Sequence, residues 1–164
     1  MAVDKSLIGR PTSASRVRIE RGPVSFFASA LKDPNTVYSD PAAAKAAGFA
    51  DLPAPPTFSF AMQHMGKAGE TQPPDPTKGS HPMNEFMGKL MAGGGIVLHG
   101  EQDFVFHRPI VVGDVLVSEG KIADVYEKEA KGKTMTFIVM ETTWRDETSG
   151  DRVVTETFNL IHRA

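Results

Sequence analysis

The second half of the chain carries the pattern of a β-sheet. From residue 96 onward, apolar positions gather in four long runs separated by turns rich in glycine, aspartate or proline. The runs cover residues 96–107, 115–126, 134–144 and 152–162. Their alternation of apolar and polar positions predicts strands, and the short turns between them predict hairpins. We therefore expect long neighbouring strands that pair antiparallel in a strongly curved sheet.

The first half is richer in alanine, proline, glycine and methionine, and it predicts mainly helices. Alternation over residues 15–20 predicts one more strand, and apolar spacing predicts helices over 23–32 and 57–65. The remaining stretches predict a proline- and glycine-rich loop over 66–82 and a further helical turn or two over 83–91.

A short helix over 41–47 is marked at both of its ends. Asp40 and Pro41 suit a helix start, and Gly48 suits a helix end. A chain of 164 residues fits one domain, which we expect to span residues 1–164. One helix layer on one curved sheet of five to six strands predicts an α+β fold.

The composition narrows the range of functions. A net charge of -2 offers no basic surface for nucleic acid or anionic lipid, and no run approaches the roughly 18 apolar residues of a membrane helix. Cysteine is absent, which excludes disulfides, thiolate metal sites and a cysteine nucleophile. The first residues do not match a signal peptide, so we expect a cytoplasmic protein. No two histidines have the spacing of a zinc site, and we expect neither a metal nor a cofactor.

The order of these elements and the run L-H-G-E-Q-D-F-V-F-H-R-P-I-V-V-G-D-V-L at residues 98–116 point to one family. Both resemble the MaoC-like (R)-specific enoyl-CoA hydratases and 3-hydroxyacyl dehydratases, in particular their N-terminal-type dehydratase domain. The resemblance covers nearly the whole chain. It implies a hotdog fold, in which a curved antiparallel sheet of five to six strands wraps a long central helix. It also implies that two hotdogs pair side by side.

The family's catalytic signature is Gly-Asp-any-Asn-Pro-aliphatic-His, and this chain has K-D-P-N-T-V-Y at residues 32–38. Asp33 and Asn35 match the acid and the amide of the signature. Thr36 replaces its proline, and Tyr38 replaces the histidine that acts as the general base. The resemblance therefore implies a catalytic turn whose base has changed. The same letters also suit an ordinary turn, because Asp-Pro and Asn favour turns.

Hydration of an enoyl thioester adds water at C3 and a proton at C2, so one group must accept a proton and another must deliver one. A neutral imidazole, with a pKa of about 6.5, suits the first task, whereas a tyrosine, with a pKa of about 10, is a poor base. Tyr38 is still able to donate a hydrogen bond. Asp33 and Tyr38 would then position a ligand without driving the reaction well.

His99 is a second candidate for the missing base. It lies near the start of the strand predicted over 96–107, a position that comes close to the partner's pocket in a hotdog dimer. The alternative is a structural histidine bonded to a backbone carbonyl. The other histidines are expected in structural or exposed places: His64 in core or lid packing, His81 in the loop, His107 beside a turn, and His162 partly solvated.

The head of the central helix is the predicted binding segment. Pro56 and Thr57 stand where the family has His-Gly, and a helix start at Thr57 would offer backbone N–H groups to a thioester carbonyl. Phe58 and Met62 are the predicted pocket walls, together with Phe60. Five methionines, at 62, 65, 83, 87 and 91, would line an acyl tunnel or would be ordinary core residues.

These features predict an (R)-specific hydratase or dehydratase that acts on an acyl-CoA or acyl-carrier-protein thioester. The competing prediction is a non-catalytic subunit that shapes the acyl pocket and pairs with a hotdog that keeps the Asp–His pair. A hotdog thioesterase, in which a carboxylate activates water, is a third alternative. We expect either a homodimer or a heterodimer with another hotdog subunit.

Overall fold

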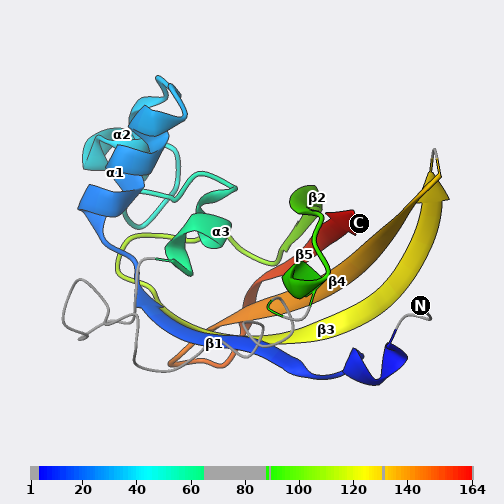
Figure 1. Ribbon diagram of the computed structural model, residues 1–164. Helices are drawn as coiled ribbons and strands as arrows, with labels where there is room; N and C mark the ends of the chain where they lie inside the picture. The colour runs from blue at the N-terminus through cyan, green and yellow to red at the C-terminus, as the bar shows by residue number, and fades with distance from the viewer. Residues whose placement is uncertain (1–3, 65–87, 89, 131, 164) are drawn as a thin grey trace.

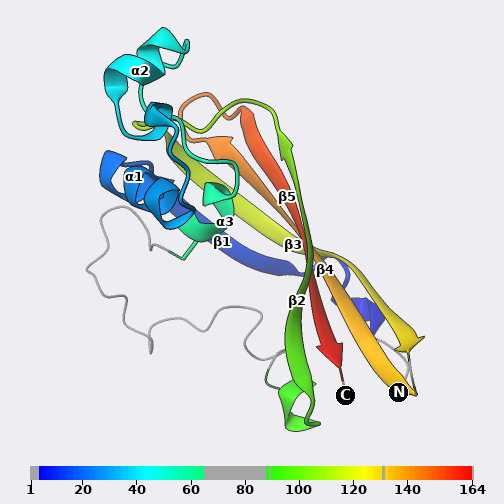
Figure 2. The same ribbon diagram turned by 90° about the horizontal axis from the view of Figure 1, so that it is seen from above.

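The computed structural model describes residues 4–64, 88, 90–130 and 132–163. Figure 1 shows a long, curved sheet with the helices on its concave side, and Figure 2 shows the same helices gathered to one side of the sheet. The predicted loop over 66–82, with His81, and the methionines at 65, 83 and 87 lie outside the described residues. Within the described ranges, no helix is long and apolar enough to cross a membrane.

The sheet has five antiparallel strands in the order β1-β3-β4-β5-β2. They are β1 (Pro11–Arg18), β2 (Ile96–Phe106), β3 (Val115–Ala130), β4 (Lys133–Asp146) and β5 (Arg152–Arg163). The four long strands predicted from alternation are confirmed. β1 begins at Pro11 rather than at residue 15, because its pairing with β3 already starts at Pro11 and Lys121.

The hairpin predicted between the first two long strands is wrong. β2 pairs with β5, whereas β3 pairs with β1 and β4. The connection over 107–114 leaves the sheet because it pairs instead with residues 53–56, which we call the proline segment. The Ala54 N–H donates to the Ile110 C=O at 2.8 Å, and an isolated bridge joins the residues beside this pair. This crossover brings the end of β2 against the proline segment.

The helices are α1 (Arg21–Ala30), α2 (Pro41–Ala46) and α3 (Phe58–Met62), with short 3-10 turns η1 (Lys5–Leu7) and η2 (Thr36–Tyr38). Residues 88 and 90–92 are helical as well. The predicted ends of α2 are confirmed, since the Asp40 carboxylate accepts the Ala42 N–H at 2.8 Å and Gly48 has a φ of +92°. α3 covers the first part of the helix predicted over 57–65 and ends at Met62, with Gln63 as its C-cap, whereas residue 65 lies outside the described residues.

The core lies between the helices and the concave face of the sheet. Trp144 of β4 and Phe58 and Met62 of α3 are among its largest fully buried side chains, and Val24 of α1 and Ala44 of α2 belong to the same cluster. Burying one such large apolar side chain stabilises a fold by about 1.5–3 kcal/mol. The core therefore fixes α3 on the sheet, together with the proline segment that precedes it.

Candidate functional site

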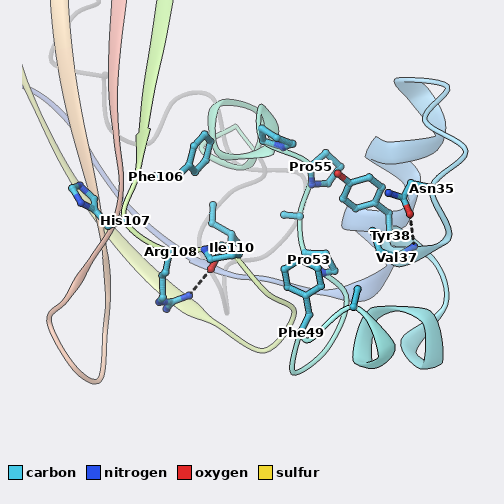
Figure 3. A pocket seen from close by; sticks show the side chains of 14 residues that line it. Asn35, Val37, Tyr38, Phe49, Pro53, Pro55, Phe106, His107, Arg108 and Ile110 are labelled. Atoms are coloured by element: carbon cyan, nitrogen blue, oxygen red, sulfur yellow. Dashed lines mark hydrogen bonds between the residues drawn. The ribbon is translucent and has the colours of Figure 1, made fainter.

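A cavity of about 580 Å³ lies between the turn that follows α1 and the end of β2 (Figure 3). Asn35, Val37 and Tyr38 line it from the turn, and the proline segment forms the wall beside them. Residues 106–110 form the opposite wall, and Ala47 and Phe49 add to the lining after α2. The predicted signature turn is thus next to a cavity, on the side where the crossover from β2 approaches the helices.

Backbone geometry at the end of α1 sets the direction of the turn. The Lys32 N–H donates to the Ser29 C=O at 3.0 Å, and the Asp33 N–H donates to the Ala28 C=O at 3.1 Å. This pair of bonds is a Schellman motif, which requires a left-handed residue after the helix, and Lys32 takes that place with a φ of +57°. The chain therefore turns sharply at Lys32 and runs toward the cavity.

The acid and the amide of the turn hold the local backbone. The Asp33 carboxylate accepts the Asn35 N–H at 3.0 Å, and the Asn35 side-chain oxygen accepts the Val37 N–H at 3.2 Å (Figure 3). Asn35 lines the cavity, whereas Asp33 is exposed and is not part of the lining. These residues therefore form the ordinary turn that the sequence also suits, and this turn presents Asn35 and Tyr38 to the cavity.

Tyr38 places its ring on the cavity, with its hydroxyl directed toward Pro55 (Figure 3). Burial raises the pKa of Tyr38, and the nearby Asp33 carboxylate raises it further, because both disfavour a phenolate. The hydroxyl is therefore protonated at neutral pH. It is suited to donate a hydrogen bond, and it is poorly suited to accept a proton.

The proline segment forms a wall with few donors. Pro53, Pro55 and Pro56 have no N–H, and the Ala54 N–H is already bonded to Ile110. The next helical donor, the Phe58 N–H, bonds to the Pro55 C=O at 2.9 Å. The wall therefore offers shape and apolar surface to a ligand more than hydrogen bonds.

The structure places only one of the four predicted binding residues at the cavity. Pro56 lines the cavity, but Thr57 is exposed, is not part of the lining and makes no side-chain cap for α3. Phe58 and Met62 are 1% and 0% exposed and belong to the core, because the apolar face of α3 packs onto the sheet. Of the five methionines predicted to line a tunnel or the core, the structure thus places Met62 in the core, and Met91 is exposed.

The opposite wall is held by polar contacts with the sheet. His107 Nε2 lies 3.2 Å from Thr155 Oγ1, and Arg108 forms ion pairs of 2.7 Å with both Asp114 and Asp146. Backbone N–H groups of the turn that follows Asp146 lower the pKa of its carboxyl, and Arg108 adds to this shift. Arg108 therefore fastens the crossover after β2 to the start of β3 and the end of β4.

Three other histidines of the described residues, His64, His99 and His162, do not line this cavity. His99 is exposed on β2, and its ring stands edge-on to Phe158, with centroids 4.5 Å apart. His64 is exposed, so the predicted packing in the core is wrong. His162 is buried and its Nε2 lies 2.8 Å from the Gly94 carbonyl oxygen, so the predicted partial solvation is wrong as well. Among the described residues no group of His, Asp or Glu could hold a metal ion.

Sequence reasoning missed three kinds of residue. Phe49, Phe106 and Ile110 line the cavity, but their position depends on the crossover, which has no local sequence signal. Of the proline segment, the sequence points only to Pro56, although three prolines in four residues also indicate a rigid wall. Glu156 is buried in β5, and strict alternation from Phe158 would have placed it on the core face.

The sequence matches the family described as FAS1-like, dehydratase domain region, over residues 6–156. A UPF0336 protein of Streptomyces avermitilis is 37% identical over 167 residues, covering 100% of this chain and 97% of that protein. A protein of Thermomonospora curvata named "Probable enoyl-CoA hydratase alpha subunit" is 31% identical over 140 residues, covering 84% of this chain and 43% of that protein.

Among solved structures, the C-terminally truncated HadBC (3R-hydroxyacyl-ACP dehydratase) complex from Mycobacterium tuberculosis contains a similar chain. The TM-score is 0.68 at 19% identity, and the alignment covers 98% of this chain and 99% of that chain. At this identity the likeness establishes the fold. The chain belongs to the FAS1-like dehydratase domain family, and it has the hotdog fold of the MaoC-like (R)-hydratases.

Proposed function

We propose that this chain is the acyl-binding subunit of a hydratase or dehydratase built from two hotdogs. Its cavity receives the acyl part of a thioester, and a partner hotdog supplies the Asp–His pair that moves protons. The reaction is the reversible (R)-specific addition of water to an enoyl thioester carried by coenzyme A or by a carrier protein. One observation carries the proposal: an apolar cavity adjoins the signature turn, yet no side chain on its described walls is placed beside that turn to act as a base.

Three side chains on the cavity walls can ionise, namely Tyr38, His107 and Arg108. Burial and the Asp33 carboxylate raise the pKa of Tyr38, which keeps its hydroxyl protonated. His107 has its Nε2 against Thr155, and Arg108 is held between two carboxylates. A general base must lie within reach of the reacting group and must be able to accept a proton. Tyr38 keeps its proton, Arg108 is a cation, and the His107 ring points away from Tyr38 and the proline segment (Figure 3). The base must then come from another chain.

The walls suit an acyl chain. Their surface comes mainly from prolines and from Phe49, Phe106 and Ile110, and a volume of about 580 Å³ lies within the range of small-molecule sites. At one side of this apolar space, Tyr38 offers its O–H and Asn35 offers its amide N–H₂, because the Asn35 oxygen is already bonded to the backbone. These donors would orient a thioester carbonyl oxygen while the walls hold the hydrocarbon.

We expect the partner to pair along the edge of the sheet formed by β2. Of the described strands, β2 pairs only with β5, so one edge of β2 has no strand beside it. Ile96, Leu98 and Val105 of β2 are exposed apolar side chains. An edge strand of this kind favours pairing with a strand of a second chain. The names of the related proteins, an alpha subunit and a two-component dehydratase complex, agree with a partner hotdog.

The competing function is a self-sufficient hydratase in which Tyr38 or His99 replaces the missing base. Its support is that the Tyr38 hydroxyl reaches the cavity and that Asp33 lies close enough to affect its pKa. His99 lies on the edge strand β2, where a second copy of this chain would contribute it across the interface. The two functions differ in whether this chain alone turns over substrate.

The test uses the purified chain with crotonyl-CoA and with a longer enoyl-CoA, followed by the loss of enone absorbance. We expect binding of dodecanoyl-CoA in calorimetry, no turnover by the chain alone, and turnover after co-expression with a hotdog that carries the complete signature. Tyr38→Phe and His99→Ala are the matched variants. Turnover by the chain alone that either variant abolishes would establish the self-sufficient enzyme instead, and failure to bind any acyl thioester would contradict both functions.

A further inference from the structure

Glu156 is a buried carboxyl for which the proposed function has no role. It lies on β5 with 4% of its surface exposed, and its Oε1 has no hydrogen-bond partner. Ser59 Oγ of α3 and Trp144 Nε1 of β4 are fully buried and also lack a partner. Both groups lie near enough to the carboxyl to oppose the rise of its pKa, although neither reaches hydrogen-bond geometry. Buried polar atoms normally have partners, so three such atoms from three elements form an unusual polar cluster at the place where these elements meet.

Glu156 is connected to both walls of the cavity through neighbouring residues. On one side is α3, whose first residue, Phe58, donates its N–H to the Pro55 C=O, so the start of α3 moves with the proline segment. On the other side, Glu156 is the cross-strand neighbour of Phe104 on β2. The Phe104 ring stacks on Phe106, with centroids 5.8 Å apart, and Phe106 lines the cavity. A change at Glu156 therefore reaches Phe106 through Phe104, and it reaches the proline segment through Ser59 and Phe58.

The charged groups on the neighbouring elements do not pair with this carboxyl. α3 carries no charged residue between its first and last positions. On β4, Glu141 pairs with Thr157 on the opposite face of the sheet and forms an ion pair with Lys121. On β2, Asp103 also faces away by alternation, and the His99 ring lies against Phe158. The protonation state of Glu156 thus depends on burial and on the two donors that face it.

We propose that Glu156 is a positioning residue for the acyl cavity: its neutral carboxyl allows α3 to pack closely on the sheet, and its ionisation, which places an unpaired charge in the buried space between them, loosens α3 and displaces both cavity walls. Burial raises the pKa of Glu156 above its ordinary value of 4.5, and Ser59 and Trp144 oppose this shift in part. The stabilisation by the protonated carboxyl is complete below pH 4.5 and is lost as the pH rises through the raised value. Acyl binding should weaken over the same interval.

The chain contains a single tryptophan, Trp144, so intrinsic fluorescence reports directly on the polar cluster. In a pH titration of the intact chain we expect the emission maximum to shift in one transition with a midpoint above 4.5. Glu156→Gln keeps the size and hydrogen-bonding capacity of the side chain and should abolish the transition. Glu141→Gln on the opposite face is the matched control and should retain it. A transition that persists in Glu156→Gln, or no transition in the wild-type chain, would overturn the proposal.

Ser59→Ala provides a second variant that does not alter the carboxyl. Because the Ser59 hydroxyl favours the charged form of Glu156, its removal should move the fluorescence midpoint to higher pH. A purely structural role for Ser59 would lower the thermal stability without moving this midpoint. An unchanged midpoint in Ser59→Ala would therefore overturn the proposed cluster even if the Glu156 variant failed to fold.

The effect on the cavity is measured with dodecanoyl-CoA, and this step rests on the proposed function. We expect its affinity to fall severalfold as the pH rises through the fluorescence midpoint in the wild-type chain, and to be independent of pH in Glu156→Gln. A fluorescence transition without any change in affinity would overturn the positioning role. If dodecanoyl-CoA binds at no pH while the transition is present, the proposed acyl ligand fails and the cluster itself stands.

Discussion

Replacing Lys32 by glycine should stabilise the protein. Lys32 has a φ of +57° and closes the Schellman motif after α1, where glycine is the preferred residue. A side chain in the left-handed region costs roughly 1–2 kcal/mol, and this strain disappears in Lys32→Gly. The added freedom of glycine in the unfolded chain offsets about 0.4–1 kcal/mol of the gain. The net stabilisation is then roughly 0.5–1 kcal/mol.

Lys45→Gly is the matched control, because Lys45 is an exposed lysine within the right-handed helix α2. The same substitution there should destabilise the protein by about 0.5–1 kcal/mol, since glycine is a poor helix former. Urea unfolding measures both values, and thermal unfolding should shift by roughly 2–4 °C per kcal/mol in a protein of this size. Loss of stability in Lys32→Gly, with the same sign as in Lys45→Gly, would refute the left-handed turn. Binding of dodecanoyl-CoA should be unchanged in Lys32→Gly, because Lys32 does not line the cavity.

Three further predictions concern the sheet and the wall after β2. Gly100→Ala should destabilise the fold by about 1–3 kcal/mol in urea unfolding, because the added methyl would lie 2.8 Å from the Asn159 carbonyl oxygen. Arg108→Met should cost about 1–2 kcal/mol, since it breaks both 2.7 Å ion pairs, with Asp114 and Asp146, while the site is only half-buried. Stability should also fall on acidification: backbone N–H groups and then Arg108 lower the pKa of Asp146 below 3.8, so its contribution is present above that pH and is lost as the pH falls. Asp146→Asn should flatten this acid limb in denaturation curves measured as a function of pH.

The parts of the fold that depend on local pattern could be predicted from the sequence. Alternation located the four long strands, and Asp40 and Gly48 located the ends of α2, because capping bonds involve residues close in sequence. The order of the strands could not be predicted in the same way. The segment over 107–114 pairs with the proline segment, far away in the sequence, instead of closing a hairpin. A connection that closes a hairpin and a connection that crosses to another part of the fold can have the same local sequence.

The same distinction between local and long-range contacts applies to the residues of the site. Asp33 and Asn35 form the predicted turn through side-chain bonds to backbone groups two residues further on. Phe58 and Met62 have the helical spacing of a pocket wall, but equally that of a core face, and only the packing of α3 on the sheet distinguishes the two. His99 lies at the predicted place on β2, and the role that the competing function gives it would require a second chain. Contacts over long range decide which residues surround a cavity.

The proposed function requires a subunit that keeps its cavity although the signature base is replaced, and the way the cavity and the turn are built agrees with this. The cavity walls continue the core: the proline segment is fixed by α3, and the wall after β2 is fixed by Arg108 and by its pairing with the proline segment. A mutation that collapses these walls also destabilises the fold, because the same packing forms both. The requirement for a stable fold therefore preserves the walls. The position of the signature base, in contrast, is a single side chain on the turn. Tyr38 occupies this position, and Asp33 and Asn35 still make their hydrogen bonds to the backbone. When a partner hotdog supplies proton transfer, the chemistry at Tyr38 is free to change, while the shape that holds the acyl chain is not.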